Sequence, residues 1–524
     1  MPKQRSRYRF PTGKGFLGEN NADAETEDSF SRGSLSLLRN YHIDGLGGLL
    51  KRQGWEHYTS NAIDSTNPVQ GLGYMDFGTP YLLAVSGTKV KRMSEATTPT
   101  WTDITGSVTI NSGQNYVQNF CTFHDGTNGN IIGTDGAGNP WKWNGSGNVS
   151  ALALTKAGDV ESFKTHVFAI NTSDRPTAIR YSDTGDPATW PADNIFDCTR
   201  DSAGVGLSLH SSETLLAFYE NSVWRINFDY GGAGALTSFF TSQLVDGSIG
   251  AVSRTGIVTS RGRTYFASRQ GIHVIDEPSR PARYVSRPLE GLWNTLNKER
   301  LKYIYAFERG EPWNEIVFLV SSTGSAFHDI ALVYNTEIAS FTGVENAWSI
   351  FESEGNNQRF NVGVNYIKSN GQHFTMLGGY DSKIAKAWGS DRNATSYTDN
   401  TTAVRSICQT GFLDMGYEGQ KSIREAWLDI HVVAKHTFSV KVDGAEERLS
   451  TNAVLDLGTD SGALDYDFTL DSSTLAAGGI AQARFKLTGN SRYFRFRLEE
   501  GDSTKPQRIE SMHFLYVPKG MRIQ

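Results

Sequence analysis

The chain has 524 residues, a net charge of −6, 54 glycines and 11% aromatic residues. This length allows two or three domains with a sizeable core, and the glycine and aromatic content, without long Ala/Leu/Glu/Lys tracts, favours an all-β fold over a helical one. The mild negative charge argues against the whole chain being a nucleic-acid-binding module, which usually carries a basic field.

The cysteines and the hydropathy pattern exclude further classes. Cys121, Cys198 and Cys408 are far apart, odd in number and contain no CxxC pair, so we expect neither a disulfide framework nor a structural zinc site. The basic N-terminus lacks the apolar core of a signal peptide. No run approaches the roughly 18 apolar residues that a membrane span needs. We therefore expect no membrane span and folding in a reducing cytoplasm.

Residues 1–34 are predicted to form an extended N-terminal arm. Arg5, Arg7 and Arg9 alternate with other residues, and the acidic stretch 23–28 follows. One interpretation is a solvated, disordered terminus, and the other is an arm that orders against a neighbouring subunit. Residues 13–18 match GxGxxG, but no βαβ unit surrounds them, so we predict no dinucleotide site there.

The stretch 35–58 carries two strand-like runs around a glycine-rich hairpin connection at residues 44–48. The first run alternates, and the second contains Trp55. Lys51 and Arg52 form a small basic spot that we interpret as a solvated strand face rather than a ligand site.

A repeating unit begins near Gly71. It consists of an apolar strand, a glycine or polar turn, and a short strand with a basic or aromatic residue. Copies spaced by about 40–60 residues indicate one four-stranded blade per repeat of a β-propeller with six or seven blades, predicted over residues 35–390. The seven copies are Tyr81–Met93, Asn130–Trp143, His166–Tyr181, Leu215–Ile226, Thr264–Ile275, Glu315–Tyr334 and Phe374–Trp388.

The stretch 250–276 illustrates this unit. Its strand signals Thr255–Ser260, Thr264–Ala267 and Ile272–Ile275 are separated by turns at Gly262 and Gly271, which predicts an antiparallel meander. We interpret its polar residues as blade-edge and turn residues, which would act, if at all, as contacts to a neighbouring chain or to a channel that an assembly of chains encloses. These residues are Arg254, Arg261, Arg263, Arg269 and His273.

Two segments depart from the repeat pattern. Leucines at roughly helical spacing predict a short amphipathic helix over Leu292–Leu301, inserted between two blades. Residues 389–402 have the composition of a linker, and beyond them residues 391–524 are predicted to form a separate β-sandwich. Its predicted strands are Arg424–Val433, Thr437–Val442, Arg484–Leu487, Arg492–Leu498 and Ile509–Tyr516.

Three motifs suggest chemistry. Ser182–Pro191 resembles the Asp-box turn of sialidase-type propellers, but its spacing differs, and we interpret it as an Asx-stabilised turn with a packed Trp190. The acidic run Asp456–Asp471 departs from the spacing of a calcium loop and is interpreted as a solvated loop. His124-Asp125 lacks a nucleophile partner, and GxSxG, HExxH and GxxxxGK[ST] are absent. We therefore predict no catalytic, cofactor-binding or metal-binding residues and no enzymatic activity.

Several segments, taken in order, resemble a known family. They are LSLLRNYHIDGLGGLLKRQGW at 35–55, RYSDTGDPATWP at 180–191, VSRTGIVTSRGRTYFASRQGIHVID at 252–276, the helix Leu292–Leu301 and the closing segment Tyr493–Pro518. Together they resemble the tail hub or nozzle protein of short-tailed bacteriophages, a family also described as head-completion or stabilization proteins.

This resemblance implies a structural virion protein in the tail, assembled in the host cytoplasm. It implies a homo-oligomeric ring, expected to be a hexamer, that docks on an adaptor ring, carries fibres or spikes and encloses the channel through which phage DNA passes without specific binding. A glycan-binding or glycan-cleaving, sialidase-like tail propeller is one alternative, and a monomeric propeller scaffold outside any virion is another. The candidate subunit contacts are Arg5, Arg7, Arg9, Lys519 and Arg522.

Overall fold

The structure is a computed structural model of the whole chain. It describes residues 5–519 except for 12–14, 22–32, 46, 60, 65–66, 96–99, 231–237, 343–345, 354–358, 390–396, 433–436, 446–450, 457–480 and 502–506.

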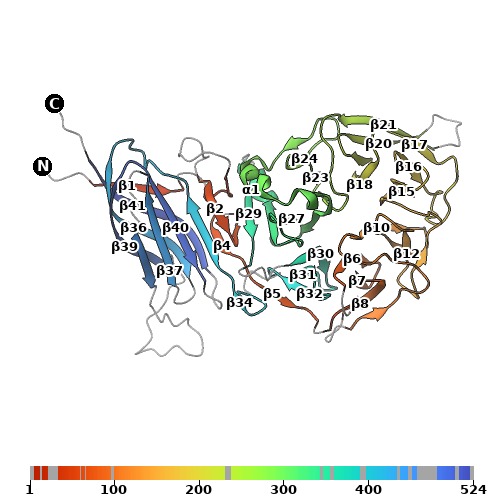
Figure 1. Cartoon of the computed structure of the whole chain (residues 1–524), viewed down its shortest axis with the longest axis horizontal. Helices are drawn as coiled ribbons and strands as arrows, with labels where there is room; N and C mark the ends of the chain where they lie inside the picture. Colours follow the sequence, from red (N-terminus) through yellow and green to blue (C-terminus); the bar gives the residue numbers. More distant parts are fainter. Residues whose placement is uncertain are drawn as a thin grey trace.

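Seven β-sheet blades form a closed ring, as predicted for a propeller (Figure 1). Six of them are separate sheets, and the seventh is one end of a larger, nine-stranded sheet. Each innermost strand contacts the innermost strands of the next and the previous blade, and the last contacts the first. These innermost strands are β6 (Val69–Asp76), β10 (Asn119–His124), β14 (Asp159–Phe163), β18 (Gly204–Ser211), β22 (Ile257–Ser260), β26 (Tyr305–Arg309) and β30 (Phe360–Ile367).

The seven repeated sequence segments are the second and third strands of the seven blades. These strands pair antiparallel and fill the cores between neighbouring blades. The second strands are β7 (Pro80–Ser86), β11 (Gly129–Thr134), β15 (His166–Ile170), β19 (Thr214–Tyr219), β23 (Arg263–Ala267), β27 (Glu315–Val320) and β31 (His373–Gly379). The third strands are β8 (Lys89–Ser94), β12 (Trp141–Trp143), β16 (Ala178–Tyr181), β20 (Val223–Tyr230), β24 (Ile272–Ile275), β28 (Ile330–Asn335) and β32 (Ile384–Ala387).

The outermost strand of the last blade comes from the beginning of the chain. Strand β5 (Trp55–His57) pairs with β32, so an N-terminal segment completes a blade whose other strands lie more than 300 residues later. Two short strands, β33 (Thr398–Asp399) and β34 (Thr402–Ala403), extend this sheet beyond β5. The other outermost strands are β9 (Thr102–Asp103), β13 (Ser150–Ala151), β17 (Ile195–Asp197), β21 (Ser238–Asp246), β25 (Arg283–Tyr284) and β29 (Trp348–Phe351).

The predicted helix at 292–301 is two shorter pieces. Helix α1 (Glu290–Thr295) ends at Leu296, whose backbone is extended, and a 3₁₀ helix (Lys298–Tyr303) follows. The side chain of Asn297 accepts a hydrogen bond from the Glu299 N–H and so starts the second piece. A single helix is therefore wrong, because Asn297 is a helix start within the leucine pattern. Another 3₁₀ turn (Arg287–Leu289) precedes α1, and helix α2 (Thr336–Thr342) follows β28.

A two-layered β-sandwich lies beside the propeller, and its layers meet at the stacked rings of Phe496 and Phe514, whose centroids are 3.8 Å apart. One layer has the order β3-β4-β41-β36-β39, with β1 (Ser6–Phe10) also paired to β41, and the other has the order β2-β35-β40-β37-β38. The strands are β2 (Leu35–Arg39), β3 (Tyr41–Ile43), β4 (Leu49–Lys51), β35 (Ser406–Thr410), β36 (Lys421–Val432), β37 (Thr437–Gly444), β38 (Thr451–Asp456), β39 (Ala481–Ser491), β40 (Phe494–Glu500) and β41 (Gln507–Pro518).

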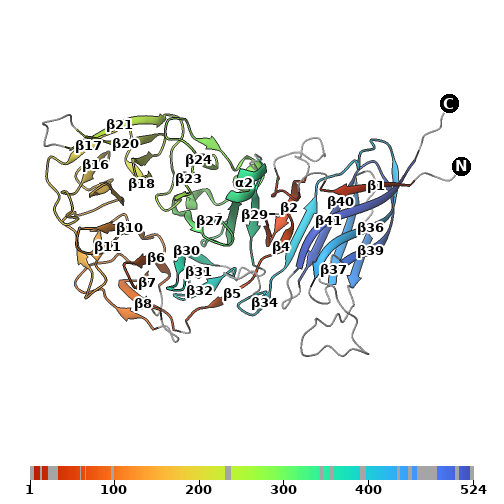
Figure 2. The ribbon, with the colours of Figure 1, turned by 180° about the vertical axis from the view of Figure 1, so that it is seen from behind.

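The sandwich is not separate from the propeller. Strands β2 and β29 pair in parallel through Arg39 and Ile350, which joins the β26–β29 blade and one sandwich layer into a single nine-stranded sheet (Figures 1 and 2). Residues 35–51, predicted to begin the propeller, instead supply β2, β3 and β4 to the sandwich. The boundary at 35 is therefore wrong, because hydrogen bonding places this hairpin against strands more than 350 residues later.

The N-terminal arm packs on its own chain. Strand β1 pairs with β41 at the outer end of the sandwich (Figure 2). Further along, the Gly18 and Glu19 N–H groups donate to the carbonyls of Asn346 and Trp348, and the buried Glu19 carboxylate pairs with Arg39. A Cβ at position 18 would lie 2.2 Å from the Trp348 nitrogen, so only glycine fits here. The described parts of residues 1–34 are thus neither disordered nor unpacked.

Lys51 and Arg52 are fully buried, so their interpretation as a solvated strand face is wrong. The Lys51 ammonium lies 2.5 Å from a carboxylate oxygen of Glu500. The two terminal nitrogens of Arg52 donate to the two carboxylate oxygens of Asp399 at 2.8 and 2.6 Å, and its Nε donates to Asn40 at 2.7 Å. This bidentate pair ties the N-terminal segment to the segment after the last blade.

A second buried ionic group continues this junction into the propeller. Arg309 donates to Glu315 at 2.8 Å and also to the Gly389 carbonyl at 2.9 Å. Burial, reinforced by the nearby arginine charges, lowers the pKa of His42 to about 4 despite the opposing effect of Glu315. The neutral His42 ring donates to Glu315 at 2.8 Å and stacks on Trp313 at 4.0 Å. The junction therefore contains several buried charged groups joined by hydrogen bonds.

Breaking the buried pair should be costly. We expect Arg52→Met to lower the free energy of unfolding by about 3–5 kcal/mol, because the Asp399 charge stays buried without its partner. Asp399→Leu added to Arg52→Met should recover much of this loss. Urea unfolding followed by tryptophan fluorescence measures both, with Arg280→Met as the control, since Arg280 and Glu277 form an exposed pair worth about 0–1 kcal/mol. Equal effects of Arg52→Met and Arg280→Met would contradict the prediction.

Candidate functional site

One face of the propeller is hollowed above the central channel. Because successive strands of a blade are antiparallel, the segments that enter the innermost strands and the hairpins between second and third strands reach the same face. These two kinds of loop alternate around a cavity of about 720 Å³. Its lining residues are Gly136, Gly158, Asn171, Ser202–Val205, Glu220, Ala251, Val252, Arg254, Arg269, Lys298, Glu299, Leu301 and Lys302.

Arg254 crosses the channel below this cavity. It belongs to the segment that enters β22, yet its guanidinium donates to the carbonyls of Val117 and Thr134, which belong to the β10–β13 blade. A Cβ at Gly136 would lie 2.8 Å from the Arg254 Nε, so glycine there leaves room for the guanidinium. Burial lowers the pKa of Arg254, and the charges of Asp159 and Asp135 oppose that shift.

Two carboxyl groups lie on the innermost strand β14. Asp159 is fully buried and accepts from Asn119 and from the Leu207 N–H, both at 2.8 Å. Burial raises the pKa of Asp159 to about 6, although Arg254 and these hydrogen bonds lower it. Glu161, which is half-buried, has its pKa raised to about 8 by desolvation and by the Asp159 charge. The interior of the ring therefore disfavours negative charge.

Some charged side chains at the rim of the cavity form ion pairs with each other, and others do not. Arg269 forms an ion pair with Glu220. Lys298 donates to the Trp293 carbonyl at 2.7 Å, and Lys302 lies over an aromatic ring. Both lysines are exposed, and within the described residues neither forms an ion pair with a carboxylate.

Strand β1 and the end of β41, which carry or adjoin the described members of the predicted subunit-contact set, lie at the outer end of the sandwich, far from this cavity (Figure 2). Arg5, Arg7 and Arg9 are exposed on or beside β1, and the Arg7 guanidinium lies 5.2 Å from the centroid of the Trp427 ring. Lys519 is exposed, and Arg522 lies outside the described residues. The structure thus places Arg7 and Arg9 on one strand and Arg5 directly before it, and their contact with a neighbouring subunit stays a prediction.

Two sequence motifs form turns, as predicted. In the Asp-box-like segment, Asp186 accepts from the Ala188 N–H at 2.8 Å and from Thr189 at 2.6 Å, and Trp190 packs partly buried against the blade core. Asp125 accepts from the N–H groups of residues 127 and 128, which closes the predicted turn after His124. The acidic run continues from Asp456 into 457–471, which lies outside the described residues.

The part of the chain that the structure describes holds no metal-binding cluster and no membrane-spanning helix. No group of three or more His, Cys, Asp or Glu residues there is arranged to hold a metal ion. Cys121 and Cys408 are buried, Cys198 is half-buried, and all three are free thiols. Burial raises the pKa of each of these thiols. No described helix is long and apolar enough to cross a membrane.

The position of Arg254 in the central channel of the propeller was not foreseen. Its interpretation as a blade-edge or turn residue correctly places it in a loop, and its expected contact to a neighbouring chain or to the channel of an assembly stays a prediction. Its partners are 120 and 137 residues earlier, and no local signal identifies them. His273 is instead an interior residue, with its ring stacked between Phe266 and Tyr284.

Comparison with known proteins finds only distant structural likenesses. No protein family and no curated protein matches the sequence. Among solved structures, a Staphylococcus aureus virginiamycin B lyase shares 10% identity at a TM-score of 0.41, covering 63% of this chain and 98% of its own. Chaetomium thermophilum Raptor shares 12% identity at 0.40, covering 67% and 30%. The C-terminal WD40 domain of Sif2 shares 10% at 0.34, covering 64% and 99%. Likenesses this distant carry no information on activity.

The raised pKa of Glu161 predicts a pH-dependent stability difference. Between pH 4.5 and about 8 the folded state holds this proton more tightly than the unfolded state, so the stability that Glu161 contributes falls as pH rises through this window. Glu161→Gln should therefore be more stable than the natural protein at pH 8.5, by about 1–2 kcal/mol after allowance for solvent screening. Near pH 4.5 this difference should vanish.

Urea unfolding at the two pH values measures this effect. The control is Glu418→Gln, which changes an exposed glutamate and should leave stability unaltered at both values. A Glu161→Gln difference of the same size at pH 4.5 and pH 8.5 would show that packing, not ionisation, is responsible.

Proposed function

We propose that the chain is a non-catalytic structural protein of a virion, forming the nozzle or hub ring of a short-tailed phage tail. In this proposal identical chains form a ring, expected to be a hexamer, that docks on an adaptor ring, carries fibres or spikes and encloses the DNA exit channel. The observation that supports it best is the coupling of the propeller to the sandwich by one nine-stranded sheet and a buried ionic junction.

The coupling matters because a ring of chains needs subunits of constant shape. Contacts between different surfaces of identical subunits close into a ring only when each subunit imposes the same rotation. A subunit with a hinge between its two bodies would vary that rotation. The parallel pairing of β2 with β29 and the Arg52–Asp399 pair oppose such a hinge.

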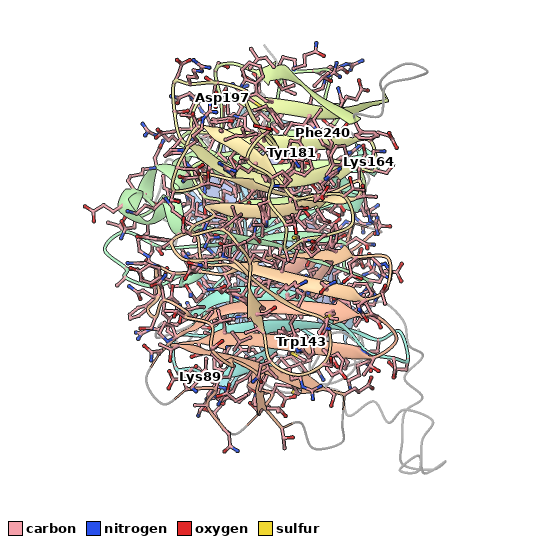
Figure 3. All side chains as sticks on the ribbon, turned by 90° about the vertical axis from the view of Figure 1, so that its right-hand side faces the viewer. Lys89, Trp143, Lys164, Tyr181, Asp197 and Phe240 are labelled. Carbon is pink, nitrogen blue, oxygen red and sulfur yellow. The ribbon has the colours of Figure 1, made fainter. Side chains whose placement is uncertain are left out.

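The edge of the propeller opposite the sandwich carries polar and charged side chains, which suit a transient contact with another molecule. Figure 3 shows the propeller edge opposite the sandwich, with Lys89, Lys164 and Asp197 labelled. Lys89 pairs with Asp103 at 3.0 Å and Lys164 with Glu213 at 2.7 Å, and Asp197 pairs with Arg175. Positive and negative groups alternate there without one dominant sign. Such a surface, with the net charge of −6, is compatible with DNA passing without being held by its phosphates.

The mass of the assembled particle tests the proposed function. Native mass spectrometry or multi-angle light scattering should show a defined multiple of 57.7 kDa, and negative-stain images should show a ring around a channel. The same measurements on a mixture of the chain and its adaptor protein should show rings if assembly requires the adaptor. A protein that stays monomeric with and without the adaptor, or that cleaves or retains glycans, would overturn the proposal.

The arginines of β1 provide a sharper test of the subunit contact. Arg5→Glu, Arg7→Glu and Arg9→Glu together should lower the fraction of assembled ring at least fivefold, because they reverse an exposed positive row without removing the backbone pairing of β1 with β41. The control reverses two exposed arginines on the propeller, Arg200 and Arg280. Unchanged assembly of the triple variant, measured by analytical ultracentrifugation, would exclude this arm from the interface.

A further inference from the structure

We propose that the cavity above the propeller channel binds a small organic anion whose carboxylate or phosphate group lies against Arg254, Lys298 and Lys302. This inference does not depend on the virion role. It rests on the position of the cavity, the pairing of its charges, its hydrogen-bond donors and its apolar wall.

The position and volume of the cavity favour a small ligand. The cavity opens on the face where loops of successive blades meet, and its volume of about 720 Å³ lies within the range of about 300–1,000 Å³ typical of ligand sites. Arg254 crosses the channel below it and is held by carbonyls of the opposite side of the ring. A ligand that enters from the face would therefore end at the guanidinium.

The pairing of charges favours an anion. Glu220 is engaged by Arg269, which leaves Glu299 as the carboxylate at the rim that has no cationic partner among the described residues. Arg254, Lys298 and Lys302 all lack an ion-paired carboxylate within the described part of the chain, and the hydrogen bonds of Arg254 and Lys298 go to backbone carbonyls. Cationic donors without carboxylate partners are suited to carboxylate and phosphate oxygens.

The acidic groups behind Arg254 are occupied elsewhere. Asp135 accepts from the N–H groups of Ala137 and Gly138 at 2.8 and 2.7 Å and from Asn111 at 2.8 Å. Asp159 is fully buried and accepts from Asn119 and Leu207, as described above. Both carboxylates are therefore enclosed by other protein donors, and although their charges act on Arg254, neither accepts a hydrogen bond from it among the described residues.

The remaining lining supplies neutral donors and an apolar wall. The amide of Asn171 accepts a bond from Lys156 through its oxygen, which leaves its nitrogen as a donor, and the hydroxyl of Ser202 has no partner among the described residues. Val205, Val252 and Leu301 line another part of the wall. Hydrogen-bond donors beside an apolar surface match a ligand that has an anionic end and a short aliphatic or aromatic portion.

Isothermal titration calorimetry with three matched probes tests this site on the full chain. Hexyl phosphate and hexanoate carry the two anionic groups, and hexanamide is a neutral compound of similar shape. We expect at least one anion to bind with a stoichiometry of one per chain, at least tenfold more tightly than hexanamide, and more weakly as NaCl concentration rises. Comparing the two anions shows which head group the site prefers.

Variants locate the site. Lys298→Met with Lys302→Met should weaken binding of the preferred anion at least fivefold, whereas Lys519→Met, which removes an exposed lysine of the sandwich, should change it less than twofold. Ala203→Trp, at an exposed position of the lining, should abolish binding by filling the cavity while circular dichroism stays unchanged. Absence of binding of both anions at 10 mM, equal binding of hexanamide, or unchanged affinity in the double lysine variant would overturn the proposal.

Discussion

The buried pair of Arg52 and Asp399 is the interaction on which the two bodies of this protein depend. Arg52 lies three residues before Trp55, the first residue of the strand that completes the last blade, and Asp399 pairs with Trp55. Neither charge could remain buried alone, since removing an ion from water without a partner costs several kcal/mol. The pair is formed only when the ends of the propeller segment have met. Closure of the ring and satisfaction of these charges are therefore the same event.

The first 60 residues connect structures that the rest of the chain builds separately. They contribute four strands to the sandwich, one strand to the propeller and the segment at Gly18 and Glu19 that runs beside Trp348. Each contact joins residues separated by hundreds of positions. Such pairing gains energy only after long loops have closed, which makes it slow to form and cooperative once formed. The N-terminal segment is thus a fastening element of the fold rather than an appendage.

The propeller channel shows how closure also creates a site. Arg254 reaches carbonyls across the ring, and the cavity above it collects Lys298 and Lys302 from one loop, Arg269 from another and the amide of Asn171 from a third. Below it, Asp159 and Glu161 have raised pKa values because the interior solvates charge poorly. A ring of sheets therefore separates an enclosed interior, where charge is penalised, from an open face that gathers cationic donors.

Local patterns in the sequence determined the blades. The second and third strands are apolar, short and bounded by turns, and for that reason all seven copies are visible, as is the Asx turn at Asp125. Asn297 is a residue type that favours helix starts, and its position within the leucine pattern was a local signal that the helix is divided there. Only the tertiary structure decided that Lys51 and Arg52 are buried and that residues 35–51 belong to the sandwich. It also decided that Arg254 crosses the central channel of the propeller. Periodicity shows which side chains share a face, whereas the segment that covers that face comes from a distant part of the chain.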